Sequence, residues 1–130
     1  MADVVYVVDN GLKAIVDELV TLSKYKYVAW GTGVTGAVAT DTAMQTASAP
    51  TTATAVTGTV SAVTTSTTND TYQVVATITA GSTLAIREVG VLNQATISGA
   101  SMFLHGTFDP INVNSGDSIE FTIKAQLNQA

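Results

Sequence analysis

The stretch that decides the fold is TYQVVATIT, residues 71–79. Every second residue in it, from Tyr72 to Ile78, is apolar, whereas most of the residues between them are polar. Successive side chains of a β-strand point to opposite faces, so this alternation predicts a strand with one buried face. The same alternation returns in IEFTIKAQL, residues 119–127, which predicts a second strand of the same kind.

Two further strand-forming runs lie between these stretches, at about residues 84–92 and 102–109. Short strands separated by turns are typical of antiparallel sandwiches and barrels. We therefore expect a mainly β fold, an antiparallel β-sandwich or jelly-roll-like barrel with one N-terminal α-helix. Pro110 is expected to end the second run, because proline cannot donate to a sheet. Glu88 lies on the apolar side of the first run, which indicates either a β-bulge near Gly90 or a carboxylate at a subunit contact.

The first third of the chain contains the one good candidate for a helix, residues 10–24. Asp9 and Asn10 suit the N-cap position, and the apolar residues that follow have the spacing of one helical stripe. These are Leu12, Ile15, Val16, Leu19 and Leu22. The β-branched run before them is expected to make residues 1–9 an arm or strand. Residues 25–130 would form the sandwich, so residues 1–130 are expected to be a single domain.

A segment rich in Thr, Ala and Ser, about residues 37–57, interrupts the strand pattern. We expect it to be extended, with a strand beginning near Thr57, because Thr and Val favour extended backbone. Residues 43–55 contain too few large apolar side chains to form a core, so disorder without a partner is the alternative interpretation.

The composition indicates a chain whose surface is buried against other proteins. Only 12% of the 130 residues are charged and 46% are apolar, whereas a typical soluble domain has about 25% charged residues. The net charge of -5, from five basic and ten acidic residues, argues against nucleic acid or an acidic membrane as partner. No apolar run approaches the roughly 18 residues of a membrane span, and the N-terminus lacks the basic region of a signal peptide.

Two motifs have the form of a functional site. Residues 31–36, GTGVTG, match G-x-G-x-x-G after a predicted strand, but no helix and no acidic residue follow at the spacing of a dinucleotide site. We interpret them as a strand-exit loop. His105 is the only histidine, and there is no G-x-S-x-G elbow, so we expect it on a polar strand face or at a subunit contact. The sequence therefore predicts no enzyme, cofactor or metal site and no small-molecule substrate.

Two groups of polar residues leave alternatives open. Asp109, Asn112, Asn114 and Asp117 could supply oxygen ligands for calcium, or they could simply form turns. Arg87 and Glu88 are adjacent and point to opposite faces of a strand. Each of the two either meets an opposite charge on another strand or subunit, or is a solvated or tolerated polar position. Trp30 is expected in the core or as an interface anchor.

Four stretches resemble structural proteins of tailed-bacteriophage virions, and the resemblance covers about residues 26–127. They are residues 26–33 (KYVAWGTG), 69–75 (NDTYQVV), 85–94 (AIREVGVLNQ) and 112–123 (NVNSGDSIEFTI). The chain departs from the phage pattern at Arg87, where Thr is expected, and at Leu92, where Phe is expected.

The resemblance implies a virion protein made in the host cytoplasm, most simply a capsid cement or decoration protein. It would form a dimer or trimer and bridge the major capsid protein or another virion protein. The alternatives are a tail, collar or fibre-base component, or a host-binding adhesin module. The residues expected at interfaces are Val4, Val5, Tyr6, Val7, Val8, Trp30, Arg87, Glu88 and His105.

Overall fold

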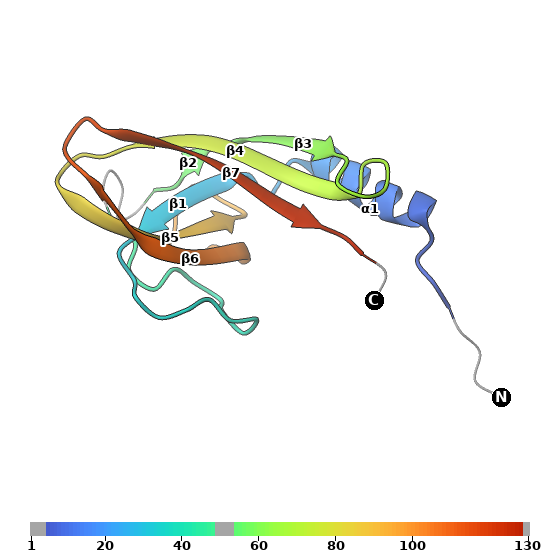
Figure 1. Ribbon diagram of the computed structural model, residues 1–130, viewed down its shortest axis with the longest axis horizontal. Helices are drawn as coiled ribbons and strands as arrows, with labels where there is room; N and C mark the ends of the chain where they lie inside the picture. Colours follow the sequence, from blue (N-terminus) through green and yellow to red (C-terminus); the bar gives the residue numbers. More distant parts are fainter. Residues whose placement is uncertain (1–4, 49–53, 129–130) are drawn as a thin grey trace.

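Two antiparallel sheets pack face to face, with one helix at the end of the sandwich (Figure 1). The computed structural model describes residues 5–48 and 54–128. Its elements are α1 (Asp9–Leu22), β1 (Tyr27–Gly31), β2 (Val56–Thr57), β3 (Thr59–Val63), β4 (Thr71–Thr79), β5 (Leu84–Leu92), β6 (Met102–Val113) and β7 (Ser118–Gln126). The strand orders are β2-β1-β5-β6 and β3-β4-β7. The expected β-sandwich with one N-terminal helix is confirmed.

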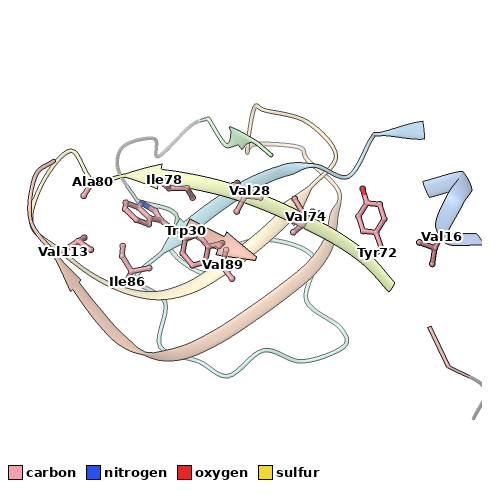
Figure 2. Packing of buried hydrophobic residues seen from close by; sticks show 13 residues of the cluster. Val16, Val28, Trp30, Tyr72, Val74, Ile78, Ala80, Ile86, Val89 and Val113 are labelled. Carbon is pink, nitrogen blue, oxygen red and sulfur yellow. The ribbon is translucent and has the colours of Figure 1, made fainter. Parts of the chain in front are cut away.

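The core lies between the two sheets and is centred on Trp30 (Figure 2). The indole is 1% exposed and meets the ring of Phe121 edge to face, with centroids 6.5 Å apart. Val74 and Ile78 on β4 and Ile86 on β5 complete the packing around it, as the alternation in the sequence predicts. Trp30 thus ties the four-stranded sheet to the three-stranded one.

Only part of the apolar stripe of helix α1 is buried against the core. Leu12 and Val16 are buried, and the helix contacts β3 and β4, whereas Ile15 is 44% exposed and Leu22 is 62% exposed. The predicted caps are wrong: the N-cap is Val8, which makes no side-chain capping bond, and Asp9 is the first helical residue. The predicted end at residue 24 is also two residues too late, because Ser23 adopts a left-handed conformation that closes the helix.

The pairing of β5 with β6 is irregular at two places. Ile86 is opposite Ile111 but Glu88 is opposite Thr107, so β6 contains two extra residues at this point; a second shift follows Val91. The bulges therefore flank the predicted position at Gly90. The prediction that Pro110 ends the strand is wrong, because β6 continues to Val113. Proline lacks an N–H, but Pro110 lies in the irregular stretch of an edge strand, where no sheet hydrogen bond is needed from it.

The Thr-rich segment supplies both a covering layer and a sheet-crossing strand. Residues 43–48 are placed, with Ala47 bridged to Gly31, so the disorder interpretation is wrong for them; residues 49–53 lie outside the described residues. The strand expected near Thr57 is present as β2 and β3, which belong to different sheets. Gly58 makes the crossing, and its N–H donates to the carbonyl of Lys26 over 2.7 Å.

No helix within residues 5–48 and 54–128 is long and apolar enough to cross a membrane.

Candidate functional site

The most unusual chemistry in the molecule lies on the outer face of the four-stranded sheet. Residues 32–48, here called the covering loop, leave the end of β1 and run beneath β5 and β6 (Figure 1). The bulge after Ile86 turns Ile86 and Val89 toward the core and Glu88 toward the loop. The loop therefore closes over a carboxylate that the sheet would otherwise expose.

Glu88 is completely buried and accepts four hydrogen bonds. Its Oε2 accepts from the N–H of Gly33 at 2.9 Å and of Thr46 at 2.8 Å, and its Oε1 accepts from the N–H of Gln45 at 2.9 Å. The fourth donor is Nε2 of His105, 2.9 Å from Oε1. Backbone donors from both ends of the covering loop thus converge on one side chain, which fixes the loop to the sheet.

The glycines of the G-x-G-x-x-G match make this approach possible. A Cβ on Gly31 would lie 2.2 Å from the backbone oxygen of Thr46, and one on Gly33 would lie 2.3 Å from Oε2 of Glu88. Neither glycine has a positive φ, so close approach, rather than conformational freedom, is what requires them. The motif does receive an anion, but the anion is a carboxylate of the same chain.

His105 lies between two carboxylates, with its side chain only 4% exposed. Its Nε2 faces Glu88, and its Nδ1 is 2.7 Å from Oδ2 of Asp41, which also accepts from the N–H of Val38. A neutral imidazole carries one N–H donor, whereas the imidazolium carries two. Only the protonated ring can therefore donate to both carboxylates, and we assign that form.

The pKa values of the three groups are coupled to this geometry. Burial of the His105 ring opposes its charge, but the hydrogen bonds to Asp41 and Glu88 outweigh burial and raise its pKa. Burial likewise opposes charge on Glu88, but the N–H groups of Gln45 and Thr46 and the His105 ring lower its pKa overall. The pKa of Asp41 is lowered by the N–H of Val38 and by His105.

The arrangement is suited to holding a loop rather than to catalysis or metal binding. Both ring nitrogens are engaged by carboxylates, so neither is free in this geometry to accept a proton from a substrate or to bind a metal. Asp41 and Glu88 lie on opposite sides of the ring and do not converge. Across the described part of the chain, no group of three or more His, Cys, Asp or Glu side chains could hold a metal ion.

The three pKa shifts predict how stability depends on pH. The pKa of His105 is raised above 6.5, so its contribution is complete below about pH 6.5 and is lost as pH rises through the raised value. The pKa values of Glu88 and Asp41 are lowered from 4.5 and 3.8, so their contributions are present above those values and are lost as pH falls through the lowered ones. The cluster is therefore expected to stabilise the fold most between about pH 5 and 6.5.

The pH dependence can be measured as the difference in unfolding free energy between the wild type and His105→Gln, by urea denaturation from pH 4 to 9. We expect the difference to be largest near pH 6 and to shrink as the solution becomes alkaline. Lys13→Gln is the control, because its ion pair with Asp17 on α1 is exposed and distant from the cluster. A difference that is constant over this range would show that folding does not shift the pKa of His105, and one that grows as the solution becomes alkaline would show that the ring is neutral in the fold.

A second buried carboxylate, on Asp70, organises the turn between β3 and β4. Its carboxylate accepts from the N–H groups of Thr65, Ser66 and Thr67 at 2.9–3.1 Å. The bond from Thr65 is the largest of the causes that hold the pKa of Asp70 well below its usual range. Asp70 acts as a cap for this turn, and no motif or spacing in the sequence indicated that role.

The molecule also has an open side. β6 and β7 are consecutive strands but belong to different sheets, and each is the last strand of its sheet. A groove of about 470 Å³ lies along this side. Its apolar lining consists of Val89, Phe108, Ile111, Ile119, Phe121 and Ile123. Core side chains are thus accessible along this edge.

The residues predicted at interfaces have different positions. Trp30 fills the core, which was one of its two expected places, and is not at an interface. Glu88 meets His105 on the neighbouring strand, as one of the alternatives had it, and the subunit contact expected for these two residues is wrong, because the covering loop of the same chain lies over them. Arg87 is half-buried and makes no ion pair among the described residues. The segment of residues 5–8 is exposed, so a contact there stays a prediction; Val4 lies outside the described residues.

The residues considered for calcium do not gather. Asp109 and Asn112 lie on β6, whereas the Oδ2 of Asp117 accepts from the N–H of Asn114 at 2.8 Å. The bond from Asn114 to Asp117 is that of an ordinary Asx-stabilised turn. The turn interpretation is confirmed for Asn114 and Asp117, and it is wrong for Asp109 and Asn112, which belong to a strand.

Comparison with known proteins gives no relative: no protein-family model matches the chain, and neither does any curated protein or solved structure.

Proposed function

We propose that this chain is an architectural subunit of a tailed-bacteriophage virion, a cement protein that binds the head shell and bridges capsid subunits. The observation that carries the proposal is the open side of the sandwich, where two edge strands and an apolar groove lie uncovered. The resemblance of residues 26–127 to virion proteins supplies the biological setting.

Exposed apolar segments away from the groove support the same role. Val5 is 93% exposed and Tyr6 is 65% exposed, and the segment leads away from α1 into the surroundings (Figure 1). Exposed apolar surface in such quantity is typical of proteins that associate. Many weak contacts made by copies on one shell would reinforce each other through high effective concentration.

The proposal is tested by adding purified protein to phage heads that lack it, and by locating it in particles by electron microscopy. A cement protein saturates regular positions on the shell and raises the temperature at which heads release their DNA. Density confined to the tail or collar would instead assign it there. Binding to host cells or glycans without binding to particles would support an adhesin and contradict the proposal.

Deletion of residues 2–7 tests the exposed N-terminal segment. The deletion keeps Val8, whose carbonyl accepts the first helical bond from Leu12, so the fold should be retained. We expect occupancy on the shell to fall at least tenfold, because about 1.4 kcal/mol of lost contact changes a binding constant tenfold. Unchanged occupancy, with an unchanged melting temperature of the free protein, would remove this segment from the interface.

A further inference from the structure

The free edge of β7 differs from every other sheet edge among the described residues. β7 pairs with β4 over all nine of its residues without a register shift, and it contains no proline. The β6 edge is broken by two register shifts and Pro110, β2 has two residues, and β3 has five and is contacted by α1. Interruption, shortness, covering and charged side chains are the usual means of protecting an edge strand from pairing. The edge of β7 has only the last of these, in Glu120 and Lys124.

The charges on β7 have no partners within its own sheet. Glu120 lies opposite Thr77 on β4, and Lys124 lies opposite Gln73. Both charged side chains are exposed, and neither takes part in an ion pair within residues 5–48 and 54–128. They are also four residues apart on one strand, about 13 Å, which is too far for them to pair with each other.

We propose that two copies of the chain associate through their β7 edges, antiparallel to each other and centred on Thr122. In this register Glu120 of each copy lies opposite Lys124 of the other, and the two Thr122 side chains face one another. Opposite charges and Thr–Thr pairs are both favourable across neighbouring strands. The two three-stranded sheets then form one six-stranded sheet about a twofold axis, the commonest symmetry of homodimers.

The sequence of β7 favours this register over its neighbours. A shift of the centre to residue 120 places Glu120 opposite itself, and a shift to residue 124 places Lys124 opposite itself, and like charges directly opposite are unfavourable. A centre on residue 121 places Glu120 opposite Thr122 and Lys124 opposite Ser118. A centre on residue 123 places Lys124 opposite Thr122 and Glu120 opposite Gln126, so neither register pairs opposite charges. Of these five registers, only the one centred on Thr122 forms Glu120–Lys124 pairs, and it forms two of them.

The same association would cover apolar surface. On the inner face of β7, Phe121 of one copy is brought beside Ile123 of the other. These two residues line the groove along the open side, so the groove of each copy meets that of its partner. Burial of the groove supplies the attraction, and the charges supply the register.

This inference rests on the proposed architectural role and names the partner of that open side as a second copy of the chain. Sedimentation equilibrium of the full chain should show a dimer in the micromolar range. Glu120→Lys or Lys124→Glu alone places two like-charge pairs across the interface and should weaken association at least tenfold. An equimolar mixture of the two variants, or the double variant, restores opposite charges and should recover dimerisation.

Glu18→Lys is the matched control, because it makes the same change of charge on the exposed part of α1 and should leave association unchanged. A wild type that remains a monomer at several hundred micromolar would overturn the inference. Dimerisation of both single variants as tightly as the wild type would also overturn the inference. Circular dichroism checks that every variant is folded.

A second measurement uses the absence of cysteine from the sequence. Residues opposite each other on antiparallel strands have Cα atoms about 4.5–5.5 Å apart, which suits a disulfide. Thr122→Cys should therefore crosslink into a dimer on oxidation, whereas Ser118→Cys should not, because Gln126 of the partner lies opposite it. Equal crosslinking of both would contradict this register. These assays use free protein, so they test the β7 pairing separately from the cement proposal. A β7 dimer that binds no phage particle would contradict the cement proposal but support the pairing of the β7 edges.

Discussion

Replacement of Glu88 by alanine is expected to lower the free energy of unfolding by about 3–5 kcal/mol, the usual cost of removing one partner from a buried ion pair. The change removes the acceptor of three backbone N–H groups and leaves the His105 ring with one carboxylate instead of two. For a domain of this size the expected fall in melting temperature is about 10–20 °C.

The covering loop should respond more than the rest of the molecule. The amides of Gly33, Gln45 and Thr46 are held by the Glu88 carboxylate, so their hydrogen exchange should become fast in the alanine variant. The amides of β4 and β7, which belong to the other sheet, should change only as far as global stability falls. Loss of protection in the loop alone would locate the effect in this cluster.

Two variants serve as controls for Glu88→Ala. Glu88→Gln retains the shape but not the charge, and its amide group would face N–H donors, so an intermediate loss is expected. Glu18→Ala removes an exposed carboxylate from α1 and should change stability by less than about 0.5 kcal/mol. If Glu88→Ala were no more damaging than Glu18→Ala, the buried carboxylate would not be what fixes the loop.

Much of the fold follows from alternation in the sequence, and the exceptions have local causes. The stretches that form β4 and β7 were predicted correctly because one face of each is turned to the core, fully buried in β4 and partly buried in β7, while the other face of β7 is exposed. The end of β6 was not predicted correctly, because the expectation for proline assumes a regular strand. Pro110 lies where β6 carries extra residues opposite Arg87. A bulge depends on both strands of a pair, so a single strand shows it only indirectly.

The buried cluster was only partly visible in the sequence. Glu88 was noticed as a charge on an apolar face, and residues 31–36 were noticed as a glycine motif, but nothing in the sequence connected the two. The connection is made by β1 and β5 lying side by side, which brings Gly31 opposite Glu88. Asp41 gave no signal at all, because it lies in a loop without periodicity. An isolated Glu in an apolar strand, a sole His and a G-x-G turn together are the signal that could have indicated a covered carboxylate.

Gly31→Ala is expected to be the second most damaging change, with a loss of about 3 kcal/mol, at the upper end of the usual cost of overpacking. The added methyl group would lie 2.2 Å from the backbone oxygen of Thr46 and 2.7 Å from Oε2 of Glu88. Neither atom can yield easily, because one belongs to the backbone and the other is held by hydrogen bonds. The covering loop must therefore move away from the sheet.

Gly36→Ala provides a matched control within the same motif. A Cβ at Gly36 would meet no atom within 4 Å, so this change should be neutral or slightly stabilising, since alanine restricts the unfolded chain more than glycine does. Urea denaturation of both variants separates two explanations of the glycine motif. If glycine were needed there for loop flexibility, both changes would be costly. If glycine is needed there for close approach to Glu88, only Gly31→Ala will be costly. In that variant the amides of Gln45 and Thr46 will also lose their protection from hydrogen exchange.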